Sequence, residues 1–175
     1  MPHGLDYREA TPLDAELVWR FLAIAAYEAD ASAARRVPIV AAHLNGWRRP
    51  GDFGVIAQRA GRPVGAAWAR QFDQSEGPIF FLGAKTPGLS LGVLEEERGK
   101  GVGLALLRRL ERMAKEQGLD GLCLNVRDSN PAIRLYQRAG YRLIKGSEVP
   151  NRIGGLSFGM LLTLANARGS EIHLA

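Results

Sequence analysis

A glycine-rich segment is the part of this sequence best suited to chemistry. Arg98 begins the string RGKGVG, in which glycines alternate with other residues. An apolar run before it predicts a strand and an amphipathic run after it predicts a helix, so the glycines stand at a strand-to-helix turn. Glycines there let backbone N–H groups approach an anion without a Cβ atom in the way, and the helix N-terminus adds a favourable dipole. The segment therefore predicts a phosphate-binding turn.

Two better-known phosphate motifs do not fit this segment. A dinucleotide fingerprint, G-x-G-x-x-G, would need glycine where Leu104 or Leu106 stands, and a P-loop needs Ser or Thr where Gly101 stands. What remains is the pattern R-x-x-G-x-G, carried by Arg98, Gly101 and Gly103. By itself this pattern is also compatible with a tight turn whose glycines serve packing alone.

The residues around the turn predict a β-α-β unit. Leu89–Val93 is expected to form a strand, followed by a helix from about Gly103 to Gln117 that Gly118 ends. Its inward face holds Leu106, Leu107, Leu110, Met113 and Ala114. The alternation of Leu122, Leu124 and Val126 predicts a second strand. A right-handed crossover between parallel strands is the natural connection for such a unit.

A second helix follows about 30 residues after the turn. Asn130 is a good N-cap residue, Pro131 suits the first helical position, and Gly140 closes the segment. The inward stripe of this helix comprises Ala132, Leu135, Tyr136 and Ala139.

The other expected elements complete a mixed α/β sheet, of the α+β type, in a single domain covering residues 1–175. They are a strand at Leu5–Ala10, a helix from Thr11–Asp14 towards Glu28, a helix at about Pro38–Trp47, a hairpin of Phe53–Gln58 with Val64–Arg70, a loop at 72–88 with some strand near Ile79–Leu82, and strands at Tyr141–Lys145 and Leu156–Leu164. About seven strands and four helices are expected in all.

Composition restricts the class of protein. The chain has 175 residues, of which 46% are hydrophobic and 23% charged, so it can bury a core. Its one cysteine, Cys123, excludes an internal disulfide, and His3, His43 and His173 are too far apart in sequence for a local metal motif. We expect no metal. The N-terminus lacks the pattern of a secretory signal and no apolar run is long enough to cross a membrane, so a cytoplasmic protein is predicted.

Positive charge is concentrated in one block. The net charge is +5, and residues 98–152 hold twelve Lys and Arg against five Asp and Glu. Such a block suits an anionic partner or a solvated helix face. Only Tyr136 and Tyr141 are aromatic within it, and it has no RNA-binding or zinc-finger signature, so nucleic acid is not expected.

Two motifs resemble the GNAT superfamily of N-acetyltransferases. The segment LGVLEEERGKGVGLALL at Leu91–Leu107 is similar to the acetyl-CoA-binding segment of that superfamily, and NPAIRLYQRAGY at Asn130–Tyr141 resembles its second motif. The opening YREATPLDAELV is also similar to the usual first strand and helix. The resemblance covers about residues 5–164 and implies a GNAT fold, with two parallel strands that splay apart at the site of acetyl-CoA, the co-substrate.

The resemblance implies roles for particular residues. Backbone groups of Leu91 and Val93 would bind the pantetheine arm, and the N–H of Val93 would donate to the acetyl oxygen in the transition state. The pyrophosphate would lie on the backbone amides of Arg98, Gly99, Lys100, Gly101, Val102, Gly103 and Leu104. The phosphate charges of coenzyme A would then explain the basic block.

The resemblance also implies a general acid. The thiolate that leaves needs a proton, and Tyr136 is the superfamily's candidate because a phenol has a pKa near that of a thiol. A core aromatic is the alternative for Tyr136, and Asn130 is either a plain cap or a cap that also contacts the cofactor arm. Cys123 has no apparent histidine base, so direct transfer is preferred to an acyl-cysteine intermediate.

The general base is open. Many relatives place a carboxylate on the strand before the loop, but GLSLGV at Gly88–Val93 contains none. Glu28, Asp73 and Glu76 are candidates, whereas the acidic run at 95–97 is expected to be solvated.

The acceptor is predicted to be a small-molecule or peptide amine. The residues that are candidates for its pocket are His43, Trp47, Arg48, Arg49 and Phe72, although His43 and Trp47 are equally consistent with a packing face of a helix. The alternative function is a coenzyme A-binding or sensing module without transfer activity. A homodimer is expected from family habit and from the apolar run at Leu156–Leu164.

Overall fold

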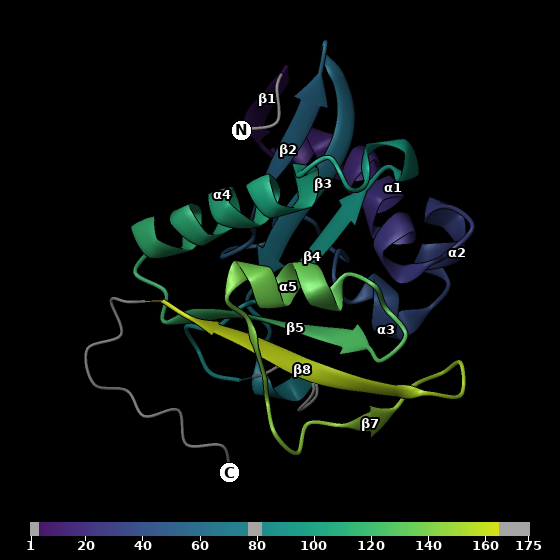
Figure 1. The fold of residues 1–175 in the computed structure, drawn as a ribbon, viewed down its shortest axis with the longest axis vertical. Helices are drawn as coiled ribbons and strands as arrows, with labels where there is room; N and C mark the ends of the chain where they lie inside the picture. Colours follow the sequence, from purple (N-terminus) through teal and green to yellow (C-terminus); the bar gives the residue numbers. More distant parts are fainter. Residues whose placement is uncertain (1–3, 77–81, 165–175) are drawn as a thin grey trace. The chain divides into compact units, whose positions relative to one another are not determined.

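The structure is a computed structural model that describes residues 4–76 and 82–164 (Figure 1). It divides into two compact units. The first comprises Met1–Arg70 with Ser90–Leu110, and the second comprises Gln71–Leu89 with Glu111–Ala175. The boundary between them falls inside the strand β4 and the helix α4. Each unit is considered in turn.

The first unit contains four neighbouring strands in the order β1-β2-β3-β4. They are β1 (Leu5–Glu9), β2 (Phe53–Arg59), β3 (Arg62–Arg70) and β4 (Gly88–Val93), the last of which starts in the second unit. β1 pairs antiparallel with β2, and β2 with β3, so the predicted hairpin is confirmed. Its turn consists of Ala60 and Gly61, both with positive φ, as a tight hairpin turn requires.

Three helices cover one face of these strands. The 3₁₀ turn η1 (Pro12–Asp14) leads into α1 (Ala15–Ala26), which ends where Tyr27 adopts a left-handed conformation with φ of 59°. α2 (Ala31–Arg35) was not predicted, and it is capped by the Asp30 side chain, which accepts a hydrogen bond from the Ala33 N–H at 2.8 Å.

The helix predicted at Pro38–Trp47 is wrong beyond its first turn. α3 covers only Pro38–Ala41, and a series of turns follows. The carbonyl oxygens of Ala42 and Asn45 accept hydrogen bonds from the Arg70 guanidinium, both at 2.8 Å. These carbonyls therefore bind a side chain of β3 instead of continuing a helix.

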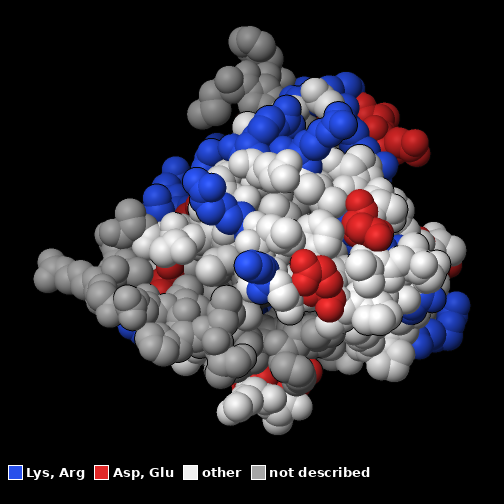
Figure 2. All heavy atoms as spheres, turned by 60° about the horizontal axis from the view of Figure 1, so that its bottom comes forward, with Lys and Arg blue, Asp and Glu red and all other residues white. Residues whose placement is uncertain are grey.

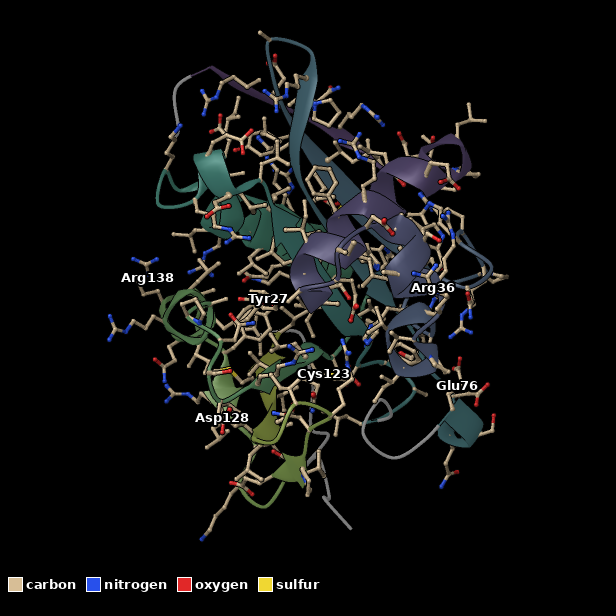
Figure 3. All side chains as sticks on the ribbon, turned by 90° about the vertical axis from the view of Figure 1, so that its right-hand side faces the viewer. Tyr27, Arg36, Glu76, Cys123, Asp128 and Arg138 are labelled. Atoms are coloured by element: carbon tan, nitrogen blue, oxygen red, sulfur yellow. The ribbon has the colours of Figure 1, made fainter. Side chains whose placement is uncertain are left out.

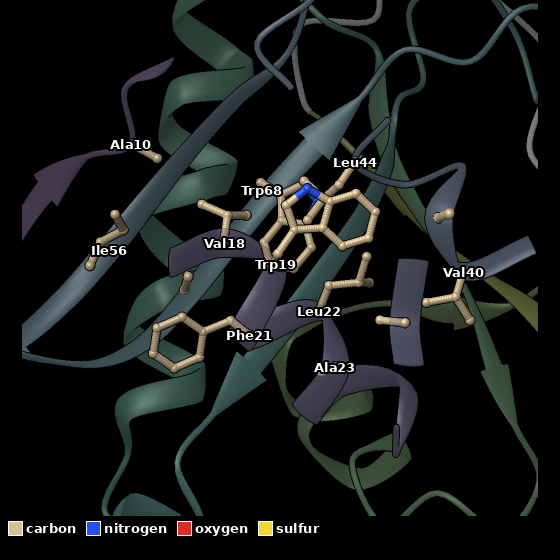
Figure 4. Packing of buried hydrophobic residues seen from close by; sticks show 13 residues of the cluster. Ala10, Val18, Trp19, Phe21, Leu22, Ala23, Val40, Leu44, Ile56 and Trp68 are labelled. Carbon is tan, nitrogen blue, oxygen red and sulfur yellow. The ribbon is translucent and has the colours of Figure 1, made fainter. Parts of the chain in front are cut away.

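The core of the first unit lies between α1 and the sheet (Figure 4). Val18 and Leu22 of α1 are fully or almost fully buried, and they belong to the same cluster as Ile56 of β2 and Trp68 of β3. Side chains alternate between the faces of a strand, so Gly65 of β3 points away from α1. A Cβ atom at Gly65 would lie 3.0 Å from Leu106 of α4, which packs on that opposite face.

The helix α4 (Val102–Glu116) has the predicted amphipathic character. Leu106, Leu107, Leu110 and Ala114 have no exposed area, which confirms four of the five residues of its inward face, and Met113 is half-buried. Gly118 follows the helix with φ of 67°, as predicted for its end. In the described part of the chain, no helix has the length and apolar character needed to span a membrane.

The second unit contains the parallel pair of strands. The start of β4 pairs with β5 (Gly121–Arg127) through Gly88 and Cys123. β5 pairs antiparallel along its whole length with β8 (Leu156–Thr163).

Two short strands, β6 (Arg142–Leu143) and β7 (Val149–Pro150), also pair with β8. The strand predicted at Tyr141–Lys145 is therefore wrong at both ends. The Tyr141 N–H caps the preceding helix by donating to the Tyr136 carbonyl, and a turn from Ile144 to Ser147 ends the ladder. The described residues thus hold eight strands and five α-helices, against about seven and four predicted. Most of the expected strand near Ile79–Leu82 lies outside the described residues.

Candidate functional site

The turn between β4 and α4 has the geometry of an anion cradle. Gly99 and Gly101 have φ values of 73° and 81°, in the left-handed region that favours glycine. The first helical hydrogen bond runs from the Ala105 N–H to the Gly101 carbonyl at 3.1 Å. The N–H groups of Val102, Gly103 and Leu104 come before the first residue that can donate within the helix, so they point out of its N-terminus. This arrangement suits a phosphate group.

Two basic side chains lie on the cradle. The Arg98 Nε donates to the Val93 carbonyl at 3.4 Å, which ties the loop to the end of β4. The Lys100 ammonium lies 3.8 Å from the Glu97 carboxylate. Both residues are exposed, so they add positive charge beside the helix N-terminus.

The acidic run before the loop is not uniformly solvated, which corrects the prediction. Glu97, in the 3₁₀ turn η3 (Glu95–Glu97), is buried, and Arg59 of β2 binds its two oxygens at 3.1 and 2.9 Å. The Arg59 guanidinium lowers the pKa of Glu97. Glu96 forms an exposed ion pair with Arg62 at 2.9 Å. Side chains of the β2–β3 hairpin therefore hold the 3₁₀ turn that precedes the glycine-rich loop. The sequence alone does not predict these contacts, because the paired residues are far apart along the chain.

β4 is held by a close backbone contact. A Cβ atom at Gly92 would lie 2.3 Å from the carbonyl oxygen of Phe21 in α1. The N–H of Leu94 donates to the Val64 carbonyl of β3 at 3.0 Å. The predicted binding residues Leu91 and Val93, both half-buried, therefore belong to a strand that is fixed by a helix and by a neighbouring strand.

A polar pair on β4 was not predicted from the sequence. The Ser90 hydroxyl lies 3.3 Å from the Nδ1 atom of His43, which follows α3. Burial, with a smaller contribution from the Arg70 charge, lowers the pKa of His43 to about 4. Of the candidate pocket residues, His43 is therefore the one that the structure brings to β4 in the first unit. Their separation of 47 residues leaves no local signal by which the pair could have been found.

The neighbours of His43 are bound elsewhere in the first unit. The Trp47 indole donates to the Thr11 carbonyl at 3.1 Å. Arg48 donates to the Ala10 carbonyl at 3.1 Å, and Arg49 lies 4.0 Å from Asp52. These side chains therefore attach the segment after α3 to the rest of the unit. For Trp47, this contact favours the interpretation as a packing residue over a role in the acceptor pocket.

In the second unit, the helix α5 (Ile133–Ala139) carries Tyr136. Tyr136 is buried and contacts the Tyr141 ring edge to face, with 6.0 Å between the centroids. Asn130 caps a turn before the helix, because its Oδ1 accepts from the Ala132 N–H at 2.8 Å. The predicted helix start is therefore too early by two to three residues, since the capped turn comes before the helix proper.

The surroundings of Cys123 disfavour a nucleophilic role. Its side chain, labelled in Figure 3, comes from β5. The Sγ atom is buried and directed to the carbonyls of Thr86 and Pro87, and burial raises the pKa of the thiol to about 12. A thiol with that pKa has almost no thiolate at neutral pH. The preference for direct transfer is consistent with this environment.

The acidic candidates for a base in the second unit have structural contacts. The Glu76 carboxylate accepts from the Asp73 N–H at 2.8 Å, and Asp73 accepts from the Ser75 N–H at 2.8 Å. Both carboxylates thus cap the 3₁₀ turn η2 (Gln74–Glu76). Phe72 of the same unit is buried, with its ring 3.0 Å from the Cβ position of Gly88.

Basic side chains gather on the face of the molecule drawn in Figure 2, where acidic ones are scattered in smaller groups. Within the described residues, no group of His, Cys, Asp and Glu has the arrangement of a metal site.

The structure is that of a mixed α/β protein, in which a glycine-rich turn and a helix connect the two parallel strands β4 and β5. The sequence model of the acetyltransferase (GNAT) family matches residues 18–141, and the chain belongs to this family.

Similar proteins agree with that membership. Mycothiol acetyltransferase of Thermobispora bispora is 36% identical over 96 residues, which are 54% of this chain and 31% of that protein. The chain therefore matches about a third of the length of this curated relative.

Solved structures share the fold. The structure of yncA from Salmonella typhimurium with its cofactor acetyl-CoA has a TM-score of 0.66 at 21% identity, covering 92% of this chain and 94% of that one. The ribosomal-protein-S18-alanine N-acetyltransferase from Escherichia coli has a TM-score of 0.67 at 18% identity, covering 95% and 97%. At such identities the likeness establishes the fold and leaves the substrate open.

Proposed function

We propose that this protein transfers an acetyl group from acetyl-CoA to a primary amine by direct attack. The observation that carries the proposal is the cradle at the start of α4. Its free N–H groups at Val102, Gly103 and Leu104, with Arg98 and Lys100 beside them, suit the pyrophosphate of coenzyme A. Family membership and the acetyl-CoA bound to yncA support this donor.

The pantetheine arm would run from the cradle back along β4 as if it were an added strand. Backbone groups of Leu91 and Val93 would bind it, and a backbone N–H of β4 at the thioester end of the arm would donate to the oxyanion. The fixed position of β4 between α1 and β3 supports this role, because a preorganised donor costs no reorganisation during the reaction. Coenzyme A supplies a thioester, whose carbonyl carbon the amine attacks.

The chemical step needs one proton to be removed and one to be supplied. The nitrogen of the neutral amine forms the C–N bond and the C–S bond breaks. The nitrogen loses its proton to water, the leaving thiolate gains a proton from the acid, and water reprotonates the acid. Tyr136 would supply the proton to the thiolate. Asn130 would hold the turn that leads into α5, the helix on which Tyr136 lies. No acyl-enzyme is formed, which fits the buried thiol of Cys123.

A thermal-shift experiment tests the donor. Millimolar acetyl-CoA is expected to raise the Tm of the protein, because a ligand that binds only the folded chain stabilises it by mass action. Gly101→Asp and Gly103→Asp place a side chain and a negative charge in the cradle and should abolish the shift. Gly118→Asp is the control, since Gly118 has positive φ like Gly101 and open space at its Cβ position, but lies after the other end of α4. An unchanged Tm with acetyl-CoA would contradict the proposal.

The acceptor class, the assembly state and the location stay predictions. A small molecule and a peptide amine are both open, and relatives of the fold include an N-acetyltransferase of ribosomal protein alanine. Thiol release with a panel of amines distinguishes transfer from the alternative function, a coenzyme A-binding module without transfer. A homodimer in the cytoplasm is expected, and light scattering at tens of micromolar protein checks the dimer.

A further inference from the structure

The pair formed by Ser90 and His43 lies on the strand that the proposed function assigns to the pantetheine arm. The arm would run from the cradle back along β4, so its thioester end lies towards the start of the strand, where Ser90 precedes Leu91. Ser90 is half-buried, and its hydroxyl is 3.3 Å from the His43 Nδ1.

The direction of Ser90 follows from the strand. Side chains two residues apart share a face, and the Cβ position of Gly92 meets Phe21 of α1. Ser90 therefore points to the face that α1 and α3 cover, and Leu91 and Val93 point to the other face. A substrate that reached Ser90 would come from the side of these helices.

The position of His43 is fixed through its backbone. Its carbonyl accepts from the Trp68 indole at 3.3 Å, and its N–H donates to the Val40 carbonyl at 3.1 Å. The carbonyls of Ala42 and Asn45 on either side are bound by Arg70, whose guanidinium is paired with Asp52 inside the unit. These contacts hold the turn that carries the imidazole in place.

We propose, resting on the transferase function above, that Ser90 binds the acceptor amine and that His43 orients the serine. The Ser90 hydroxyl donates to the His43 Nδ1, which leaves the serine oxygen to accept a hydrogen bond from the amine N–H. The lone pair of the amine nitrogen then faces the thioester. Ser90 is thus a residue for binding the amine, and His43 is a positioning residue.

The pair does not act as the general base. The positive charge of Arg70 on β3 opposes a second charge on His43, and Asp52 is already engaged by Arg70. The pKa of His43, about 4, lies some six units below that of an alkylammonium, a gap of roughly a million-fold in proton affinity. The amine that Ser90 binds is therefore the neutral form, and a neutral hydroxyl suits it better than a carboxylate would.

Steady-state kinetics with saturating acetyl-CoA and the best amine of the panel test the proposal. Ser90→Ala should lower kcat/KM for the amine about 5- to 50-fold, the range for loss of one hydrogen bond in a buried site, with the acetyl-CoA Kd within two-fold. His43→Asn keeps an acceptor near the Nδ1 position and should stay within a few fold of the wild type. His43→Leu removes it and should match Ser90→Ala. The shape of the acidic limb should be the same in all variants.

Ser32→Ala is the matched control, because the Ser32 hydroxyl accepts from Arg36 on the exposed surface of α2. It should leave kcat/KM unchanged. Wild-type kcat/KM in Ser90→Ala would overturn the inference while leaving the transferase function intact. An acidic limb that His43→Asn shifts would show that His43 is a base and would overturn it equally. No thiol release by the wild type with any amine would overturn both proposals.

Discussion

Gly92 of β4 and Phe21 of α1 touch backbone to backbone. A Cβ atom at position 92 would come within 2.3 Å of the Phe21 carbonyl oxygen and within 3.1 Å of its Cβ atom. The backbone oxygen cannot move without moving the helix, so the first unit tolerates only glycine here. Since β4 carries the proposed binding groups, this contact also determines where they stand.

Gly92→Ala is therefore expected to destabilise the fold by more than 2 kcal/mol, roughly the upper part of the range for overpacking. Urea unfolding measures the loss. Gly92 does not have positive φ, so its loss reports the clash alone. Gly46→Ala gives the scale of backbone strain without a clash, about 1 kcal/mol, because Gly46 has φ of 67° with nothing within 4 Å of its Cβ position. Equal losses in the two variants would show that the helix yields to the added methyl group.

The ion pair of Arg70 and Asp52 is expected to be sensitive to removal of one partner. Both side chains are 1% exposed and are joined at 2.6 Å. Asp52→Ala leaves a buried guanidinium without its carboxylate and should cost about 3–5 kcal/mol in the free energy of unfolding. Glu16→Ala, which breaks the exposed pair with Arg35, should cost less than about 1 kcal/mol. A cost for Asp52→Ala as small as that of Glu16→Ala would contradict the burial of this pair.

His43 should make stability depend on pH. Its pKa is about 4 in the folded chain and about 6.5 when unfolded, so between these values the unfolded chain binds more protons. Stability is therefore full above about pH 6.5 and falls as the pH drops towards 4, by up to about 3 kcal/mol. His43→Asn should remove this part of the slope in unfolding experiments at pH 4–7. The same slope in the variant would mean that the imidazole is not desolvated.

The wild-type pH profile should show that the amine must lose its proton before attack. At pH 7 only roughly one alkylamine molecule in 2500 is neutral. With no carboxylate on β4 and a neutral His43, the acidic limb of kcat/KM should keep rising towards the pKa of the amine. A limb that levels near pH 7 would reveal a protein base, and Glu28, Asp73 and Glu76 would be the first residues to replace.

Tyr136→Phe tests the general acid. It should lower kcat by roughly 10- to 10⁴-fold while acetyl-CoA affinity stays within a few fold, because the phenol acts on the leaving thiolate. The alkaline limb of the wild type should fall as the phenol ionises. Unchanged kcat in an assay limited by chemistry would leave Tyr136 as the core aromatic that its contact with Tyr141 also supports.

The sequence by itself determined the features that depend on local patterns. The hairpin, α1, the β4-turn-α4 unit and the buried stripe of α4 follow from side-chain periodicity and from glycines at turns, which act over a few residues. The cradle at Gly99–Gly103 was predicted for the same reason. The two sequence motifs were sufficient to identify the family.

The tertiary structure alone decided what depends on distant residues. α3 stops at Ala41 because carbonyls after it bind Arg70, and Glu97 is buried because Arg59 reaches it from another strand. The pairing of Ser90 with His43 depends on how α3 is placed on β4. Such contacts join residues that are tens of positions apart in the sequence. They leave no periodic pattern in any short segment, so they become visible only once the chain is folded.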